Sequence, residues 1–161
     1  MEIVFVRVDE RLIHGQITIR WVKMVGANII LVANDEAANN TFQKNLMKMA
    51  SPPGVTIEVE SLDNAAKKIN QIAWPNEKVM VIIKNPIDLL DLVEKGLMNK
   101  NINIGGVRQP GAKIKLSKEV MATEEELEAW KKLDEKGLHL EIQWLPDQGV
   151  TNLNNVLKKY K

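Results

Sequence analysis

A short segment near the start of the chain combines a histidine with residues that could bind or transfer a phosphate group. His14 is followed by Gly15 and Gln16, and Asp9 and Arg11 precede it. A neutral imidazole can shuttle a proton or attack phosphorus as a nucleophile. A carboxylate could orient the ring by accepting one ring N–H, and an arginine could neutralise charge on phosphoryl oxygens. The segment therefore fits proton-transfer or phosphoryl-transfer chemistry, and the latter depends mainly on positioning and electrostatics.

The same residues also have structural interpretations. A loop histidine can cap a turn, and Asp9 and Arg11 can form an ordinary surface ion pair. Asp9 could instead hold the loop by accepting hydrogen bonds from backbone N–H groups. Arg7 could bind phosphate, or it could end a strand as a surface cation. Local chemistry leaves these alternatives open.

Composition narrows the classes of function. The chain has 161 residues and a net charge of +1, so its overall charge does not favour nucleic acid or a membrane surface. The absence of cysteine excludes disulfides, thiol catalysis and cysteine-built zinc sites. With only two histidines, a metal site is not expected. Aromatic residues make up 4% of the chain, which gives no support for base stacking on nucleic acid. We expect one domain over residues 1–161.

The pattern of short β-branched runs and amphipathic segments predicts an α/β protein. Strands are expected over 3–6, 29–32, 55–59, 79–83, 102–104 and 138–143. Helices are expected over 16–25, 36–50, 63–73, 87–95, 124–136 and 152–159. Thr123 and Glu126 form a candidate capping box, and Gly26 is suited to a helix C-terminus. We predict a three-layer α/β/α fold whose central sheet has about six or seven mostly parallel strands, one of them antiparallel.

Ligands of such folds bind beyond the carboxyl ends of the strands, at a point where the strand order reverses. Polar residues and glycines follow four of the predicted strands, in the segments 7–16, 34–36, 84–86 and 105–111. Lysine outnumbers arginine 18 to 4, yet three of the four arginines fall in these segments. Arginine is the better bidentate partner for phosphate, so this distribution favours an anion site there.

The remaining candidates in these segments have mixed interpretations. Asn34 and Asp35 are typical helix-capping residues, with lining the site as the alternative. Gly105 and Gly106 would permit a tight turn or a close backbone approach. Arg108 could contact a phosphate or a partner.

Two further groups of residues are expected to be structural. His139 falls on the polar face of an alternating strand, so we expect it to be exposed. Trp21 and Trp130 occupy helical positions with apolar companions, which predicts core packing.

The segment RVDERLIHGQ, residues 7–16, closely resembles the phosphorylation-site segment of the IIB components of mannose/fructose/sorbose-family sugar phosphotransferase systems (PTS). The resemblance continues at 32–36, 52–55, 84–86 and 103–106, and it follows the family over essentially the whole chain. It implies that His14 accepts a phosphoryl group on Nδ1, the pros nitrogen, from a phosphohistidine of a IIA domain. His14 would then donate this group to a sugar carried by the membrane components IIC and IID, as a sugar phosphotransferase.

The resemblance also implies a cytoplasmic protein, peripherally associated with its membrane transporter, that needs no metal or organic cofactor. The residues predicted to act in catalysis are His14, Arg11 and Asp9. Phosphate-binding or loop-binding roles are predicted for Gly15, Gln16, Arg7, Asn34, Asp35, Gly105, Gly106 and Arg108. The expected partners are IIA, IIC, IID and the transported sugar, and no nucleic acid.

Two other classes of function stay open, because a fold alone does not define an activity. One is a small enzyme that uses His14 in acid–base or phosphatase-like chemistry, although no second catalytic group stands out. The other is a non-catalytic regulatory or binding module. The sugar could be mannose, fructose, sorbose, glucose or an amino sugar such as N-acetylgalactosamine. The sequences at 9–11 and 32–36 favour the amino-sugar branch. Because the chain starts at Met1 and ends near its last predicted helix, we expect the IIA donor to be a separate protein.

Overall fold

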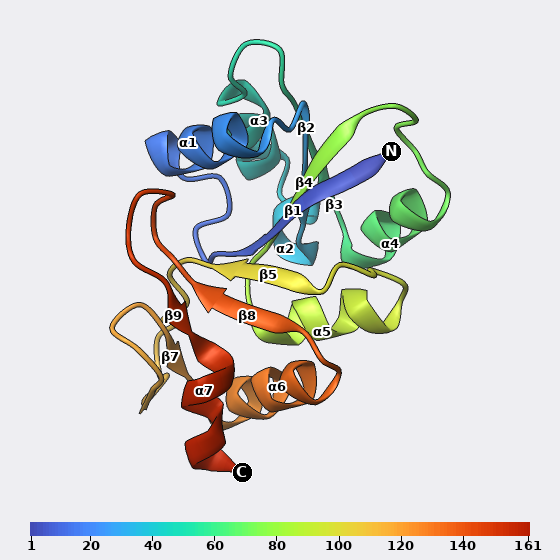
Figure 1. Cartoon of the computed structure of the whole chain (residues 1–161). Coiled ribbons are helices and arrows are strands. Elements are labelled where there is room, and N and C mark those ends of the chain that lie inside the picture. Colours follow the sequence, from blue (N-terminus) through green and yellow to red (C-terminus); the bar gives the residue numbers. More distant parts are fainter.

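A central sheet of seven strands organises the computed structural model, which describes all residues from 1 to 161 (Figure 1). The strands are β1 (Glu2–Val8), β2 (Ile29–Ala33), β3 (Thr56–Glu60), β4 (Lys78–Ile83), β5 (Asn101–Ile104), β8 (His139–Ile142) and β9 (Thr151–Asn152). Their order across the sheet is β3-β2-β4-β1-β5-β8-β9. All neighbours pair in parallel except β8 and β9, which are antiparallel. The predicted, mostly parallel sheet is confirmed.

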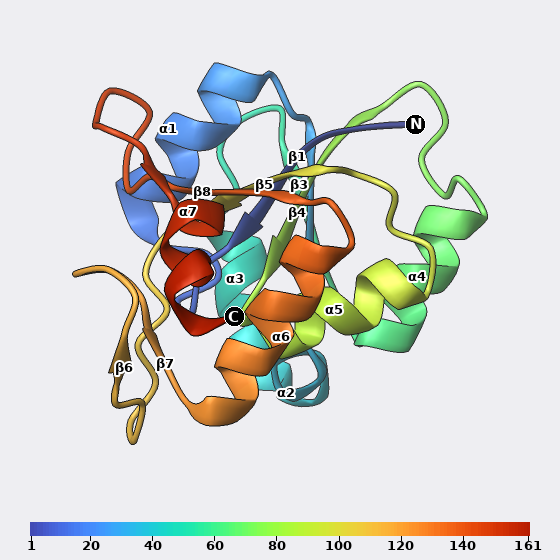
Figure 2. The same cartoon turned by 60° about the horizontal axis from the view of Figure 1, so that its bottom comes forward.

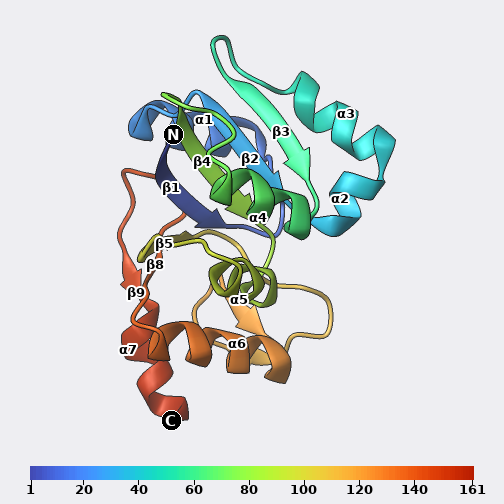
Figure 3. The same ribbon diagram turned by 90° about the vertical axis from the view of Figure 1, so that its right-hand side faces the viewer.

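Helices cover both faces of this sheet and complete the predicted three layers (Figures 2 and 3). One face carries α1 (Gly15–Val25), α2 (Asp35–Asn39) and α3 (Thr41–Met49). The other face carries α4 (Leu62–Asn70), α5 (Pro86–Glu94), α6 (Glu124–Glu135) and α7 (Leu153–Leu157), and the chain ends in the 3-10 helix Lys158–Tyr160. None of the helices has the length and apolarity needed to cross a bilayer.

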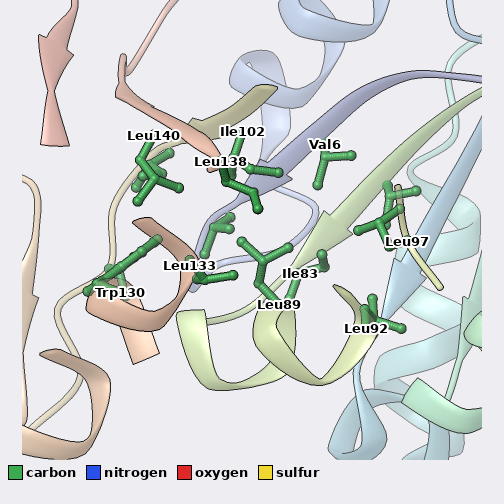
Figure 4. Packing of buried hydrophobic residues seen from close by; sticks show 14 of the residues in the cluster. Val6, Ile83, Leu89, Leu92, Leu97, Ile102, Trp130, Leu133, Leu138 and Leu140 are labelled. Atoms are coloured by element: carbon green, nitrogen blue, oxygen red, sulfur yellow. The ribbon is translucent and has the colours of Figure 1, made fainter. Parts of the chain in front are cut away.

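Alternation along the strands builds a separate apolar core on each face. Ile30 and Val32 of β2 pack with Trp21 of α1, whereas Leu31 and Ala33 belong to the opposite core. Strand β2 is buried throughout because helices cover it on both sides. Figure 4 shows the second core, in which residues of α5 and α6, including Leu89 and Trp130, pack against strand residues such as Val6 and Ile102. The predicted burial of Trp21 and Trp130 is confirmed.

The direction in which successive strands are added across the sheet reverses between the adjacent strands β1 and β4, and this reversal marks the position of a site. From β1 the chain passes through α1 to β2, whereas from β4 it passes through α5 to β5. β1 and β4 are parallel neighbours, so their connections leave adjacent strand ends toward opposite faces. Connections that separate in this way leave a crevice at the carboxyl ends of the strands.

Several predicted element ends are confirmed. Thr123 and Glu126 form a complete capping box at the start of α6. Gly26 ends α1 in the left-handed conformation, with φ 71°. His139 is exposed on β8, as expected for the polar face of an alternating strand.

Other predicted elements are wrong in extent. The helix predicted over 36–50 is two helices, because Asn40 adopts an extended conformation and its side chain accepts a hydrogen bond from the Gln43 N–H. This local capping bond competes with a continuous helix. Residue 152 lies in β9 rather than in the predicted helix 152–159, and it caps α7. A hairpin of β6 (Ile114–Lys115) and β7 (Met121–Ala122) lies between β5 and α6 and was not predicted.

Candidate functional site

The loop between β1 and α1, residues 9–14, lies at the carboxyl edge of the sheet beside the neighbouring strands. The Asp9 N–H donates to the Ile83 carbonyl at the end of β4, and the Glu10 N–H donates to the Gly106 carbonyl after β5. The buried side chain of Leu12 anchors the middle of the loop, although Leu12 adopts a left-handed conformation with φ 58°. A non-glycine residue held in this conformation indicates a loop whose shape is fixed by its surroundings.

His14 ends this loop and precedes the first residue of α1. Its backbone N–H donates to the Thr18 hydroxyl at 2.7 Å, and its side chain makes no capping hydrogen bond. The alternative of a histidine that merely caps a turn is therefore not observed. Gly15 follows in a left-handed conformation, with φ 47°, which permits the sharp approach to the helix. The imidazole thus lies at a helix N-terminus, where unpaired N–H groups suit an anion.

The His14 ring presents its two nitrogens to different surroundings. Nε2 lies 2.8 Å from Nη1 of Arg11, whereas Nδ1 is buried and has no hydrogen-bond partner. Because a guanidinium group can only donate, Nε2 must accept this hydrogen bond. In a neutral ring the proton then resides on Nδ1. Arg11 therefore selects one tautomer of His14 in the resting protein.

Arg7 forms a buried network just behind the loop. Its guanidinium donates to Asp9 Oδ2 at 3.1 Å, to the Gln143 carbonyl at 3.0 Å, to the Trp144 carbonyl at 3.2 Å and to the Asn103 side chain. The residue is 2% exposed, so the alternative of a surface cation is wrong. Burial lowers the pKa of the Arg7 guanidinium, and the adjacent Asp9 carboxylate partly offsets this effect.

Asp9 holds the loop and makes no hydrogen bond to His14. Oδ2 accepts from Arg7, and Oδ1 accepts the backbone N–H of Arg11 at 3.1 Å. The side chain is buried, so a surface Asp9–Arg11 ion pair is excluded. Of the two roles considered for Asp9, the geometry favours the loop-holding one.

Gly105 and Gly106 provide space for neighbouring side chains rather than a special backbone conformation. A Cβ on Gly105 would collide with the Arg7 guanidinium and the Asp9 carboxylate. A Cβ on Gly106 would lie 2.9 Å from Cζ3 of Trp144. Both glycines permit the close approach that their sequence position suggested.

The other predicted site residues lie in local structural contacts. Asn34 caps α2 by accepting the Ala37 N–H at 2.8 Å, and Asp35 accepts the Leu62 N–H at 2.8 Å. Arg108 donates from its side chain to the Lys118 carbonyl at 3.2 Å. Gln16 is exposed on the first turn of α1. These contacts support the capping interpretation of Asn34 and place neither Asn34 nor Asp35 against His14.

Trp144 is the site residue that the sequence did not single out. Its ring centroid lies 6.3 Å from that of His14, with an angle of 75° between the planes. The Arg11 guanidinium carbon lies 5.6 Å from the centroid of the Trp144 ring. Trp144 follows β8 by two residues, so the rule of strand ends that identified the other segments could have found it.

A polar hollow of about 340 Å³ adjoins the loop on the side of β4. It is lined by Glu10, Lys84, Asn85, Val107, Gln109, Pro110 and Glu126. His14 is not among these residues. No group of three or more histidine, aspartate or glutamate side chains is placed to hold a metal ion.

The chain matches a family model described as PTS system sorbose subfamily IIB component over residues 3–161. It is 32% identical to the fructose-specific EIIB component of the PTS of Bacillus subtilis (strain 168), across 98% of this chain and 97% of that protein. It is 36% identical to the mannose-specific EIIAB component of Escherichia coli (strain K12), across 99% of this chain and 49% of that protein. The chain thus spans about half the length of this second relative.

The crystal structure of the IIBSor domain of the sorbose permease from Klebsiella pneumoniae is similar throughout. The two chains superpose with a TM-score of 0.92 at 31% sequence identity, covering 100% of this chain and 99% of that one. The shared fold therefore includes the strand ends at which His14, Arg11 and Trp144 lie.

Proposed function

Because the chain belongs to the sorbose subfamily of PTS IIB components, we propose that it carries a phosphoryl group on His14 between two partners. A phosphohistidine of a IIA domain donates the group, and a sugar entering through IIC and IID accepts it. In the first step the P–N bond to the donor histidine breaks as a P–N bond to His14 forms. The protein would act in the cytoplasm, against the membrane components.

The observation that carries this proposal is the pairing of His14 with Arg11 at the N-terminus of α1. The ring supplies the nucleophile, and the guanidinium and the helix N-terminus supply positive charge for the phosphoryl oxygens. Arg11 is exposed and forms no salt bridge, so its remaining donors are available. A phosphatase-like enzyme would need a further acid or base, but the buried carboxylate of the loop, Asp9, is already bound by Arg7.

We further propose that Nδ1 is the nitrogen that becomes phosphorylated, as the family resemblance implies. In this arrangement Nδ1 is buried, and in a neutral ring whose Nε2 accepts from Arg11 it carries the proton, so it cannot attack phosphorus without a rearrangement. The ring must turn about its Cβ–Cγ bond, and Arg11 must leave Nε2. Arg11 can then bind the phosphoryl oxygens instead, which also frees Nε2 to take the proton.

The sugar is proposed to lie in the range of mannose, fructose, sorbose and N-acetylgalactosamine. Its selection would rest with IIC and IID, because these components would bind the sugar. Growth of a deletion strain on a panel of these sugars, with uptake of each labelled sugar, identifies the substrate.

The proposal is tested by phosphorylation in vitro. Incubation with phosphoenolpyruvate, the general phosphotransferase proteins and a cognate IIA should label the protein with an acid-labile, alkali-stable phosphoryl group. The label should be lost in His14→Ala and kept in His139→Ala, which removes the other histidine from an exposed position. Labelling that persists in His14→Ala contradicts the proposal. Nitrogen NMR of the phosphorylated ring separates Nδ1 from Nε2.

A further inference from the structure

Trp144 contacts both residues of the proposed phosphoryl site, although it lies on a different strand end. Its indole ring is nearly perpendicular to the His14 ring, with centroids 6.3 Å apart. It also lies 5.6 Å from the guanidinium carbon of Arg11, within the range of a cation–π contact. The Arg11 side chain interacts with two groups, which are Nε2 of His14 and the indole of Trp144.

The backbone of Trp144 is held in place from two other elements. Its carbonyl accepts hydrogen bonds from Nη2 of Arg7 at 3.2 Å and from Nε1 of Trp21 at 3.1 Å. The preceding residue, Gln143, is fixed by its own N–H to the Ile104 carbonyl at 2.9 Å. Buried donors of β1 and α1 therefore fix the place from which the indole projects.

The far end of the indole is confined by Gly106. A Cβ at this position would lie 2.9 Å from Cζ3 and 3.4 Å from Cη2 of the ring. The indole therefore occupies space that exists only because residue 106 has no side chain. A half-buried ring that is fixed at its backbone and confined at its tip has few orientations available.

We infer that Trp144 is a positioning residue for phosphoryl transfer, which holds the Arg11 guanidinium over its ring. When Arg11 leaves Nε2 of His14, the indole keeps the guanidinium beside the site, where it can bind the phosphoryl oxygens. This inference rests on the proposed function of His14. The indole is uncharged, so it can hold the cation without competing with the phosphoryl oxygens for it. An arginine restrained before the reaction loses less freedom when it binds the phosphoryl group, and the transfer is faster as a result.

The test compares Trp144→Leu with Trp144→Phe and with Trp74→Leu. Trp74 is the matched control, because it also makes a cation–π contact, in which Nζ of Lys68 lies 5.4 Å from the centroid of the indole. This contact lies away from the loop that carries His14. With phosphorylated IIA as donor, Trp144→Leu should lower kcat about tenfold and leave the KM for the donor unchanged. Trp144→Phe should retain more activity, and Trp74→Leu should match the parent protein.

A second readout does not depend on phosphoryl transfer. NMR signals of the Arg11 guanidinium in the unphosphorylated protein should be separate in the parent protein and averaged by free rotation in Trp144→Leu. Gly106→Ala should displace the indole and give a smaller change in the same direction, so the inference can be tested even if Trp144→Leu does not fold. Gly149→Ala is its control, because a Cβ there meets nothing within 4 Å.

The outcomes separate the two proposals. Unchanged Arg11 signals in both Trp144→Leu and Gly106→Ala, or a kcat equal to that of Trp74→Leu, overturn the role of Trp144. If the parent protein accepts no phosphoryl group, the proposed function fails, and the Arg11 signals alone then decide whether Trp144 positions that residue.

Discussion

Two arginines on one short segment, Arg7 and Arg11, differ in nearly every property except residue type. Arg7 is 2% exposed and donates to two side chains and two backbone carbonyls. Arg11 is exposed and donates to the His14 ring. Arg7 cannot bind a new anion without giving up bonds that shape the loop, whereas Arg11 has donors left for one. Burial thus separates an arginine that builds the site from one that can act in it.

The comparison also explains why Asp9 stays out of the proposed chemistry. Its two oxygens are used by Arg7 and by the Arg11 backbone, so it connects the buried arginine to the exposed one. The ion pair of Arg7 and Asp9 is buried, so removing one partner leaves the charge of the other uncompensated. Substitutions in the two regions should therefore affect folding and transfer very differently.

The largest effect on folding is expected for Arg7→Met. This change leaves the Asp9 carboxylate buried without its cation, so the free energy of unfolding should fall by about 3–5 kcal/mol. Urea denaturation of the purified protein measures it. Arg7→Met/Asp9→Leu should recover part of the loss, because no unpaired charge remains. A loss below about 1 kcal/mol in the single variant would show that the buried pair does not hold the loop.

An intermediate effect is expected for Gly105→Ala. The added Cβ meets the Arg7 guanidinium and the Asp9 carboxylate, and this crowding should lower the free energy of unfolding by about 1–3 kcal/mol. Gly149→Ala is the control, since neither its φ nor its surroundings oppose a side chain. Equal stability of the two variants in thermal denaturation would refute the crowding at Gly105.

The smallest effect on folding is expected for Arg11→Ala, although its effect on transfer should be large. The side chain is exposed, so the free energy of unfolding should change by no more than about 0.5 kcal/mol. The rate of phosphorylation of His14 should fall by at least about tenfold, because the variant lacks the guanidinium that would neutralise charge on the phosphoryl oxygens. Rapid-quench labelling measures this rate.

Arg20→Ala serves as the control for Arg11→Ala, because Arg20 is an exposed arginine on α1 that pairs with Asp147 at 3.1 Å. It should leave both stability and transfer unchanged. If Arg11→Ala loses stability in proportion to activity, or if Arg20→Ala slows transfer as much, Arg11 has no direct role in the site.

Local sequence signals predicted most of the fold because they act over a few residues. Helix caps such as Thr123 with Glu126, and β-branched runs such as that of β2, formed as expected. The features that were not predicted, a break in one helix and a short hairpin, depend on the competition between local and tertiary contacts. Asn40 splits one predicted helix through a side-chain bond to the Gln43 N–H, and the short β6–β7 hairpin pairs only two residues on each strand. Neither leaves a clear periodic signal.

The sequence by itself determined the segment that carries His14 and Arg11, since only two residues separate them along the chain. It could not determine which arginine is buried. The bonds that bury Arg7 reach Asn103, Gln143 and Trp144, which are 96, 136 and 137 residues away. Only the parallel packing of β1, β5 and β8 brings these groups together. The tertiary structure therefore decided that Arg7 supports the loop and that Trp144 faces His14, because both depend on contacts between distant strand ends.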